Sequence, residues 1–212
     1  MKKNTSLENR WIGLLFLCYF FGLLGICIPL YRDIFLPLTP INLILTLLIF
    51  YKVNNDYSQR FFLLSLLIFS LGFSIEGVGV ATGALFGNYS YGSVFGFKLF
   101  ETPVVIGINW LFLALSTYGV VQYFTKKTIW LILLPSIFMT GLDFLVEPIA
   151  MKLGFWSWEN DIIPLQNYAM WFLTSVIIHS IIWLFRPTIK ANISFAVLGV
   201  QVLFFGILSV FL

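Results

Sequence analysis

The stretch FFLLSLLIFSLGFSIEGVGVATGA occupies residues 61–84 and decides the fold class of this chain. It contains one ionisable side chain, Glu76, and is otherwise almost entirely apolar. About 20 consecutive apolar residues are enough for a helix to cross a bilayer. The stretch therefore predicts a transmembrane helix that carries a carboxyl group within the membrane.

Six further stretches have the same character. They cover residues 11–30, 38–53, 103–124, 128–150, 167–185 and 190–212. Of the 212 residues, 60% are apolar and 10% are charged, whereas average soluble domains have about 25% charged residues. This composition excludes a soluble domain, a disordered chain and a disulfide scaffold. We predict an all-α polytopic helical bundle of about seven transmembrane helices, with residues 1–212 forming a single transmembrane domain.

The basic residues give the predicted bundle an orientation, because cytoplasmic loops carry the excess of Lys and Arg. When the loops are assigned alternately, nine basic residues fall on one side: Lys2, Lys3, Arg10, Lys52, Arg60, Lys126, Lys127, Arg186 and Lys190. Three fall on the other: Arg32, Lys98 and Lys152. We expect a multi-pass protein of the cell membrane with its N-terminus in the cytoplasm and its C-terminus outside.

Several classes of partner and cofactor are not expected. A net charge of +3 without a basic stripe gives no reason to expect nucleic acid. Cys18 and Cys27 would lie on opposite faces of one helix, so they form neither a disulfide nor a metal pair. The single histidine, His179, excludes a histidine-based metal site, and its favoured interpretation is structural. No metal and no cofactor are expected, and the sequence does not predict an oligomeric state.

Three carboxyl groups lie within predicted helices. Glu76 lies past the midplane of its helix, toward the outside. Asp143 and Glu147 share one face of a second outward-running helix, because they are four residues apart. Pro148 is expected to kink or end that helix. Intramembrane carboxyl groups are costly and usually functional, and no Lys or Arg lies in the outer halves of these helices.

Other polar and aromatic residues fall in the same outer layer. They are Asn88, Tyr89, Tyr91, Glu101, Asn109, Trp110, Trp156, Trp158, Gln166, Asn167 and Tyr168. Simpler interpretations exist for some of them. Glu101 suits an interfacial acid, the loop aromatics suit an aromatic belt, and Gly79 with Gly83 forms a GxxxG pattern suited to close helix packing.

The carboxyl cluster suggests acid catalysis on a hydrophobic substrate. Burial and mutual repulsion are expected to keep at least one carboxyl group protonated near neutral pH. Such an acid can protonate an alkene, and aromatic faces and a second carboxylate can stabilise the resulting tertiary carbocation. Capture of water gives an alcohol, with a carboxylate as general base. Attack by the polyene itself gives a ring, and these residues do not choose between the two outcomes.

The motifs over residues 70–175 resemble the carotenoid biosynthesis membrane protein family of the carotenoid 1,2-hydratase and bisanhydrobacterioruberin hydratase type. They run from Glu76-Gly77 through Thr82-Gly83 to Phe86-Gly87-Asn88-Tyr89-Ser90-Tyr91, then Glu101-Thr102-Pro103 with Asn109-Trp110, Asp143 with Glu147-Pro148, Trp156 with Trp158, and Pro164 with Asn167-Tyr168 and Trp171. The resemblance implies addition of water to the terminal double bond of an acyclic (ψ-end) carotenoid without a redox cofactor.

The resemblance also implies roles for individual residues. Glu76, Asp143 and Glu147 become the acid–base candidates. Tyr89, Asn109, Asn167 and Tyr168 become candidates for positioning substrate or water. We add Glu101, Trp110 and Trp158 to these candidates because they fall in the same outer layer. The expected partners are a hydrophobic carotenoid substrate and the lipid bilayer.

Two alternatives remain beside this hydratase. A small membrane-type lycopene cyclase would share the protonation step, although the sequence has no clear Pro-x-Glu-Glu motif of such cyclases. A proton-coupled transporter or a carotenoid-binding membrane protein would also use intramembrane acids. Transporters usually contain internal repeats, and none is visible here.

Overall fold

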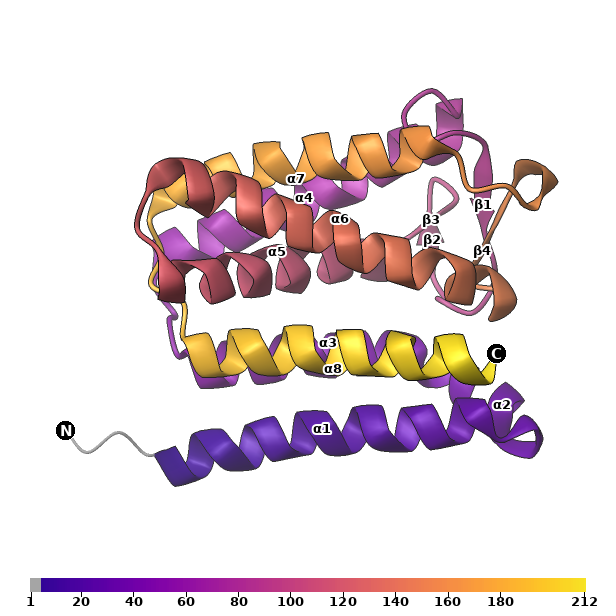
Figure 1. Ribbon diagram of the computed structural model, residues 1–212, viewed down its shortest axis with the longest axis horizontal. Coiled ribbons are helices and arrows are strands. Elements are labelled where there is room, and N and C mark those ends of the chain that lie inside the picture. The colour runs from indigo at the N-terminus through magenta and orange to yellow at the C-terminus, as the bar shows by residue number, and fades with distance from the viewer. Residues whose placement is uncertain (1–4) are drawn as a thin grey trace.

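The computed structural model describes residues 5–212 and is a bundle of long helices that run side by side (Figure 1). Within these residues, seven helical segments are long and apolar enough to cross a membrane. They are α1 (Thr5–Cys27), α2 to α3 (Pro29–Asn54), α4 (Gln59–Thr82), α5 (Val105–Phe124), α6 (Thr128–Lys152), α7 (Leu165–Phe185) and α8 (Ala191–Phe211). The predicted all-α polytopic bundle is therefore confirmed, while a single domain over the whole chain stays a prediction.

The boundaries follow the local chemistry of the chain. The first span begins at Thr5 rather than residue 11 and ends at Cys27, because Pro29 starts the short helix α2 (Pro29–Phe35). A single 3-10 turn, Leu36–Leu38, leads into α3 (Thr39–Asn54). Helix α6 does not end at Pro148 but continues to Lys152. Ile149 and Ala150, in the turn after the proline, are buried, and their packing holds that turn in place.

Helix α5 is the centre of the bundle. It contacts α3, α4, α6, α7 and α8. In its most apolar part 83% of the residues are buried, against 22% for α1. Gly107 and Gly119 allow this close packing, since a Cβ atom at Gly107 would lie 2.8 Å from the Phe69 ring and one at Gly119 would collide with the Ser194 hydroxyl. The predicted functional residues of α5 are therefore held inside the bundle.

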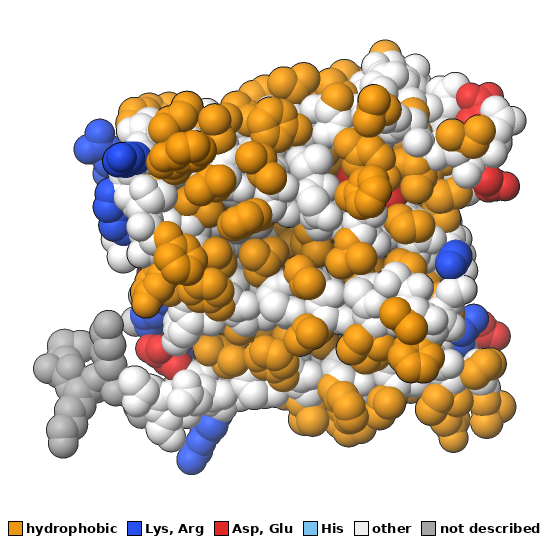
Figure 2. All heavy atoms as spheres, viewed as in Figure 1, with side chains coloured by type: hydrophobic (Ala, Val, Ile, Leu, Met, Phe, Trp, Pro, Cys, Tyr) orange, Lys and Arg blue, Asp and Glu red, His pale blue; other side chains and the backbone are white. Residues whose placement is uncertain are grey.

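Charged side chains gather at the two ends of the molecule. Figure 2 shows most Lys and Arg at the end where α1 begins, most Asp and Glu with a few Lys and Arg at the opposite end, and an apolar band between them. This distribution matches a helical bundle that spans a membrane. The orientation with the N-terminus in the cytoplasm stays a prediction, and Lys2 and Lys3, which contribute to it, lie outside the described residues.

Two small antiparallel sheets close the end opposite the N-terminus. Strand β1 (Tyr89–Tyr91) follows α4 and pairs with β4 (Trp156–Trp158), which follows α6. Strands β2 (Lys98–Leu99) and β3 (Thr102–Pro103) pair just before α5. A 3-10 turn, Glu159–Asp161, connects β4 toward α7. The β1–β4 sheet joins the two long loops across the ends of the helices (Figure 1).

Candidate active site

The β1–β4 sheet directs four aromatic side chains toward the helices. Tyr89 lies opposite Trp158, and Tyr91 opposite Trp156. Successive side chains of a strand point to opposite faces, so these four share one face, while Ser90 and Ser157 share the other and are exposed. The sequences Tyr-Ser-Tyr and Trp-Ser-Trp therefore form a lid whose inner face carries two phenol and two indole donors.

Three of the surrounding donors converge on Glu76 of α4. Its Oε2 accepts hydrogen bonds from the Tyr89 hydroxyl at 2.6 Å and the Tyr91 hydroxyl at 2.7 Å. Its Oε1 accepts from Trp110 Nε1 at 2.9 Å. The Trp110 ring also stacks on Trp171 of α7, with centroids 4.1 Å apart. The Glu76 carboxyl group is thus held on both oxygens.

Glu147 of α6 is held in the same way. Its Oε2 accepts from Trp156 Nε1 and Trp158 Nε1, both at 2.7 Å. Its Oε1 accepts from Asn167 Nδ2 at 3.1 Å. Indole and amide N–H groups can donate but cannot accept, so the donors around Glu147 match an ionised carboxylate.

Asp143 has a different environment. The same Asn167 amide nitrogen donates to its Oδ2 at 3.0 Å. Within residues 5–212 no protein hydrogen bond engages its second oxygen, Oδ1. Asp143 is only 3% exposed, so it is a buried carboxyl group with one donor where Glu76 and Glu147 each have three.

Two glycines of α4 make room for these donors. A Cβ atom at Gly72 would lie 2.5 Å from the Cβ of Trp110, and one at Gly79 would lie 2.5 Å from the Phe86 ring and 3.1 Å from the Tyr89 hydroxyl. Gly83 ends the helix with φ +64°. The interpretation of Gly79 and Gly83 as a helix-packing pattern is therefore wrong, because loop aromatics occupy the space beside Gly79 and Gly83 is a left-handed C-cap.

The two phenols act as hydrogen-bond donors over the whole ordinary pH range. Burial, and next the nearby charge of Glu76, raise the pKa of both Tyr89 and Tyr91 above the usual value for tyrosine. The tyrosines therefore stay neutral. All the hydrogen bonds that the three carboxyl groups accept within residues 5–212 come from neutral groups.

Small cavities adjoin the carboxyl cluster. The carboxylate cavity has a volume of about 20 Å³ and is lined by all three acids, Asn167 and the lid aromatics. A volume of this order holds one water molecule, provided that polar groups surround it. The middle cavity has a volume of about 60 Å³ and is mostly apolar, and its walls include Asn109, Trp156, Trp171 and Gln201. Asp143 lines both cavities.

The structure brings most of the predicted site residues together. Glu76, Asp143, Glu147, Tyr89, Trp110, Trp158 and Asn167 form the hydrogen-bonded cluster just described. Asn109 lines the middle cavity. Tyr168 lies against the ring of Phe144, which is 65% exposed. Glu101 is exposed on the turn between β2 and β3 with φ +59°.

Four residues of the site had no role assigned from the sequence. Tyr91 and Trp156 were predicted to lie in the outer layer, and both donate to carboxylates from the lid. Trp171 stacks on Trp110 and lines two of the cavities, and Gln201 lines the middle cavity from α8. The two-residue spacing of Tyr89 with Tyr91 and of Trp156 with Trp158 was the signal that could have assigned the first two to the site. Gln201 is 3% exposed, and its signal was an amide in the middle of an apolar span.

The buried histidine lies away from this cluster. His179 Nε2 is 3.1 Å from Thr117 Oγ1, and its Nδ1 is 3.0 Å from Ser136 Oγ. The side chain is fully buried. Across residues 5–212, no group of three His, Cys, Asp or Glu side chains has an arrangement that could hold a metal ion.

The fold and the site define a multi-pass membrane protein that encloses three carboxyl groups under an aromatic lid. The model of the family described as "Carotenoid biosynthesis protein" matches residues 38–212. The chain therefore belongs to the carotenoid biosynthesis protein family, as its motifs predicted. The matched region includes every residue of the hydrogen-bonded cluster.

One curated relative is a bisanhydrobacterioruberin hydratase from Haloarcula japonica. The two proteins are 31% identical over 121 residues, which is 53% of this chain and 40% of the relative. The match thus spans less than half of that hydratase. No solved structure matches the chain. Family and relative together support a carotenoid-modifying role in a membrane.

Proposed function

We propose that this protein is a membrane hydratase that adds water to the terminal double bond of an acyclic carotenoid. The observation that carries the proposal is that the three neighbouring carboxyl groups accept different numbers of hydrogen bonds. From residues 5–212, Glu76 and Glu147 each accept three hydrogen bonds, whereas Asp143 accepts one and lines an apolar cavity. The family and the hydratase relative support a carotenoid as the substrate class.

Asp143 serves as the proton donor in this proposal. Within residues 5–212 no cation pairs with the three buried carboxyl groups. They cannot all be ionised at low energetic cost, and the least hydrogen-bonded one takes the proton. With Asn167 donating to Oδ2, the proton of Asp143 belongs on Oδ1. From there it passes to the less substituted carbon of a terminal isopropylidene group in the middle cavity, and the π electrons form the new C–H bond.

The tertiary carbocation then lies among aromatic faces and anions. Trp156 and Trp171 line the middle cavity, and their rings stabilise a cation through their π faces. The ionised Asp143 and Glu147 act electrostatically at close range. These groups are already in position, so the developing charge requires little rearrangement of the site.

Water completes the reaction from the other side of Asp143. The carboxylate cavity has room for a water molecule beside Glu147. The water oxygen forms the C–O bond, and its released proton passes to Glu147 as general base. Transfer of that proton to Asp143, one helical turn away, restores the starting state. The net change is the addition of H₂O, without an oxidant or a reductant.

Expression in lycopene-producing bacteria tests the proposal. We expect products heavier than lycopene by the mass of one water for each modified end, detected by mass spectrometry. A cyclised product would have the mass of lycopene and a changed absorption spectrum, and it would contradict the hydratase. Pigment that is bound but never altered would favour a binding or transport protein instead.

A further inference from the structure

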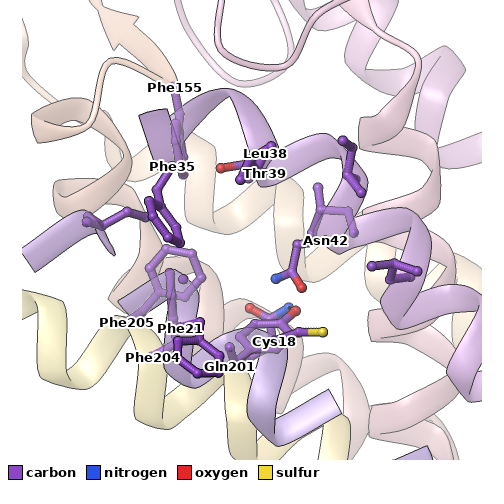
Figure 3. Close-up of a pocket in the computed structure, with 16 residues that line it drawn as sticks. Cys18, Phe21, Phe35, Leu38, Thr39, Asn42, Phe155, Gln201, Phe204 and Phe205 are labelled. Carbon is purple, nitrogen blue, oxygen red and sulfur yellow. Dashed lines mark hydrogen bonds between the residues drawn. The ribbon is translucent and has the colours of Figure 1, made fainter. Parts of the chain in front are cut away.

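A third cavity adjoins the site on the side away from the carboxyl groups. The α1/α8 cavity has a volume of about 230 Å³ and is walled by α1, α3 and α8, with Phe35 and Phe155 at its edge (Figure 3). Its lining is overwhelmingly apolar and aromatic. It shares five residues with the middle cavity: Thr39, Leu43, Phe155, Gln201 and Phe205. The two cavities therefore lie against common walls.

The three cavities form a series that leads to the acids. The α1/α8 cavity adjoins the middle cavity through those common residues, and the middle cavity adjoins the carboxylate cavity through Asp143, Trp156 and Trp171. Gln201 of α8 lines the first two, and Figure 3 shows it between the helices of the α1/α8 cavity. Polar groups become frequent only at the far end of this series.

The α1/α8 cavity also reaches the lipid-facing surface. Two of its lining side chains, Phe21 on α1 and Ile41 on α3, are 52% and 54% exposed. Both belong to helices long and apolar enough to span a membrane, so the mouth of the cavity is bordered by apolar side chains that face hydrocarbon. A hydrophobic molecule can enter here from the bilayer without crossing water.

We infer that the α1/α8 cavity binds the chain of an acyclic polyene while its end group reaches Asp143. The inference rests on the proposed function and adds its binding site and entry route. A middle cavity of about 60 Å³ accommodates only an end group, so the rest of a long polyene needs the space that adjoins it. The polyene enters laterally between α1 and α3, and its isopropylidene end passes Gln201 to the middle cavity.

Blocking the cavity is the first test. Gly22 on α1 lines it, and a Cβ atom there would meet only Phe204 at an ordinary 3.7 Å. Gly22→Phe fills the space without touching the carboxyl cluster. The matched control is Gly13→Phe on the same helix, where the glycine is exposed and a Cβ would meet nothing within 4 Å.

We expect Gly22→Phe to lower hydration of lycopene at least about tenfold, because the phenyl ring occupies the space that the polyene chain needs. Gly13→Phe should keep the wild-type rate. Equal rates for the two variants, at equal amounts in the membrane, would overturn the route. A wild-type protein that leaves lycopene unchanged would instead reject the proposed function, so the two failures are distinct.

A binding measurement covers the case in which Gly22→Phe fails to insert. Cys18 lines the cavity, and Cys27→Ser leaves it as the sole cysteine of the sequence. In a Cys27→Ser, Asp143→Asn double variant, preloaded lycopene should slow the reaction of Cys18 with N-ethylmaleimide about tenfold or more. β-Carotene, whose ends are rings, should protect much less. No protection by lycopene, or equal protection by both, would overturn the inference.

Discussion

Helices α5, α6 and α7 contribute side chains to two buried polar layers that differ in their hydrogen bonding. One contains Trp110, Asp143 and Asn167, and the other contains Thr117, Ser136 and His179. On α5 and on α6 the two layers are seven residues apart, which is about two turns or roughly 10 Å. Both are buried, and both contain ionisable groups. Burial of a titratable side chain in this bundle therefore does not by itself mark a reactive site.

The layers differ in how completely they are hydrogen-bonded. Each ring nitrogen of His179 lies within hydrogen-bond distance of a hydroxyl group, and these hydroxyls also lie close to backbone carbonyls of their own helices. In the carboxyl layer, Asp143 has a single donor among the described residues and borders two cavities. The histidine layer, whose polar groups are hydrogen-bonded to one another, specifies how the helices pack. The carboxyl layer has an acid with one hydrogen bond beside two cavities, so it can bind reactants and transfer a proton.

The largest effect should come from removing the carboxyl group of Asp143, the acid with the fewest hydrogen bonds. Asp143→Asn keeps the size of the side chain but cannot release a proton, so hydration should fall by about 10²–10⁴-fold. Product formation per molecule of inserted protein, measured by mass spectrometry, is the readout. Asp161→Asn is the matched control, because Asp161 is exposed in a left-handed turn that Asn also tolerates. Wild-type hydration by Asp143→Asn would remove Asp143 from the mechanism.

Glu147→Gln should have the next largest effect. The variant keeps an acceptor for the indole N–H groups of Trp156 and Trp158 but loses the negative charge and the base. We expect a decrease of about tenfold to a hundredfold, attributable to lost electrostatic stabilisation and proton transfer. If the rate fell only as much as in a conservative change at an exposed glutamate, the base would have to be sought at Glu76.

The two lid tyrosines should have intermediate effects that depend on each other. Tyr89→Phe and Tyr91→Phe each remove one donor from Glu76 Oε2 and leave the other. The remaining phenol still holds Glu76 Oε2, so each single change should slow hydration only several-fold. The double change leaves Glu76 free to take the proton that Asp143 needs, so it should slow hydration by more than the product of the single effects. A double-mutant cycle measures this coupling, and independent effects would show that the phenols do not share one function.

The environment of the same two tyrosines predicts how their ionisation depends on pH. Their pKa values are raised in the folded protein, so the neutral phenols persist as the pH rises past the usual tyrosine value. Absorbance difference spectra of wild-type protein and Tyr89→Phe, Tyr91→Phe should therefore show no ionisation of these two side chains near pH 10. Their ionisation at an ordinary pH would mean that the lid is open to solvent.

The fold class could be predicted from the sequence because it depends mainly on the length and position of apolar stretches along the chain. Long apolar stretches are read directly from the chain, and most of their limits moved by only a few residues. The exceptions are the first span, which begins at Thr5 rather than residue 11, and the second, which begins at Pro29 rather than residue 38. The three acids could also be picked out, since an ionisable residue within an apolar span is conspicuous. Their convergence on one depth followed from the alternation of the spans.

The arrangement within the site could not be predicted in the same way. Pairing of β1 with β4 joins loops that are far apart in the sequence, and only this pairing places Tyr89 and Trp158 side by side. The number of donors on each acid depends on that pairing, as does the distinction between Asp143 and Glu147. Gln201 was missed because a single amide carries no periodic signal.

The histidine layer should respond in the opposite way to the carboxyl layer. His179→Gln removes ring contacts and at least one buried hydrogen bond, and we expect a loss of about 1–3 kcal/mol in stability. Hydration per folded molecule should stay close to the wild-type value. Thermal unfolding in detergent, compared with turnover of the remaining folded protein, separates the two. Loss of turnover without loss of stability would place His179 in the proton path.

The smallest effect should come from substitution of Glu101. The sequence predicted it in the same outer layer as the three acids, but in the structure it lies outside the hydrogen-bonded cluster. Its side chain is exposed on the β2–β3 turn. Glu101→Gln should therefore change stability by no more than about 0.5 kcal/mol and leave hydration unchanged. Measured beside Glu147→Gln, the same chemical change at two sites isolates the contribution of burial and donor contacts. A comparable loss of turnover in both variants would show that depth in the membrane, rather than the geometry under the lid, decides which acids act.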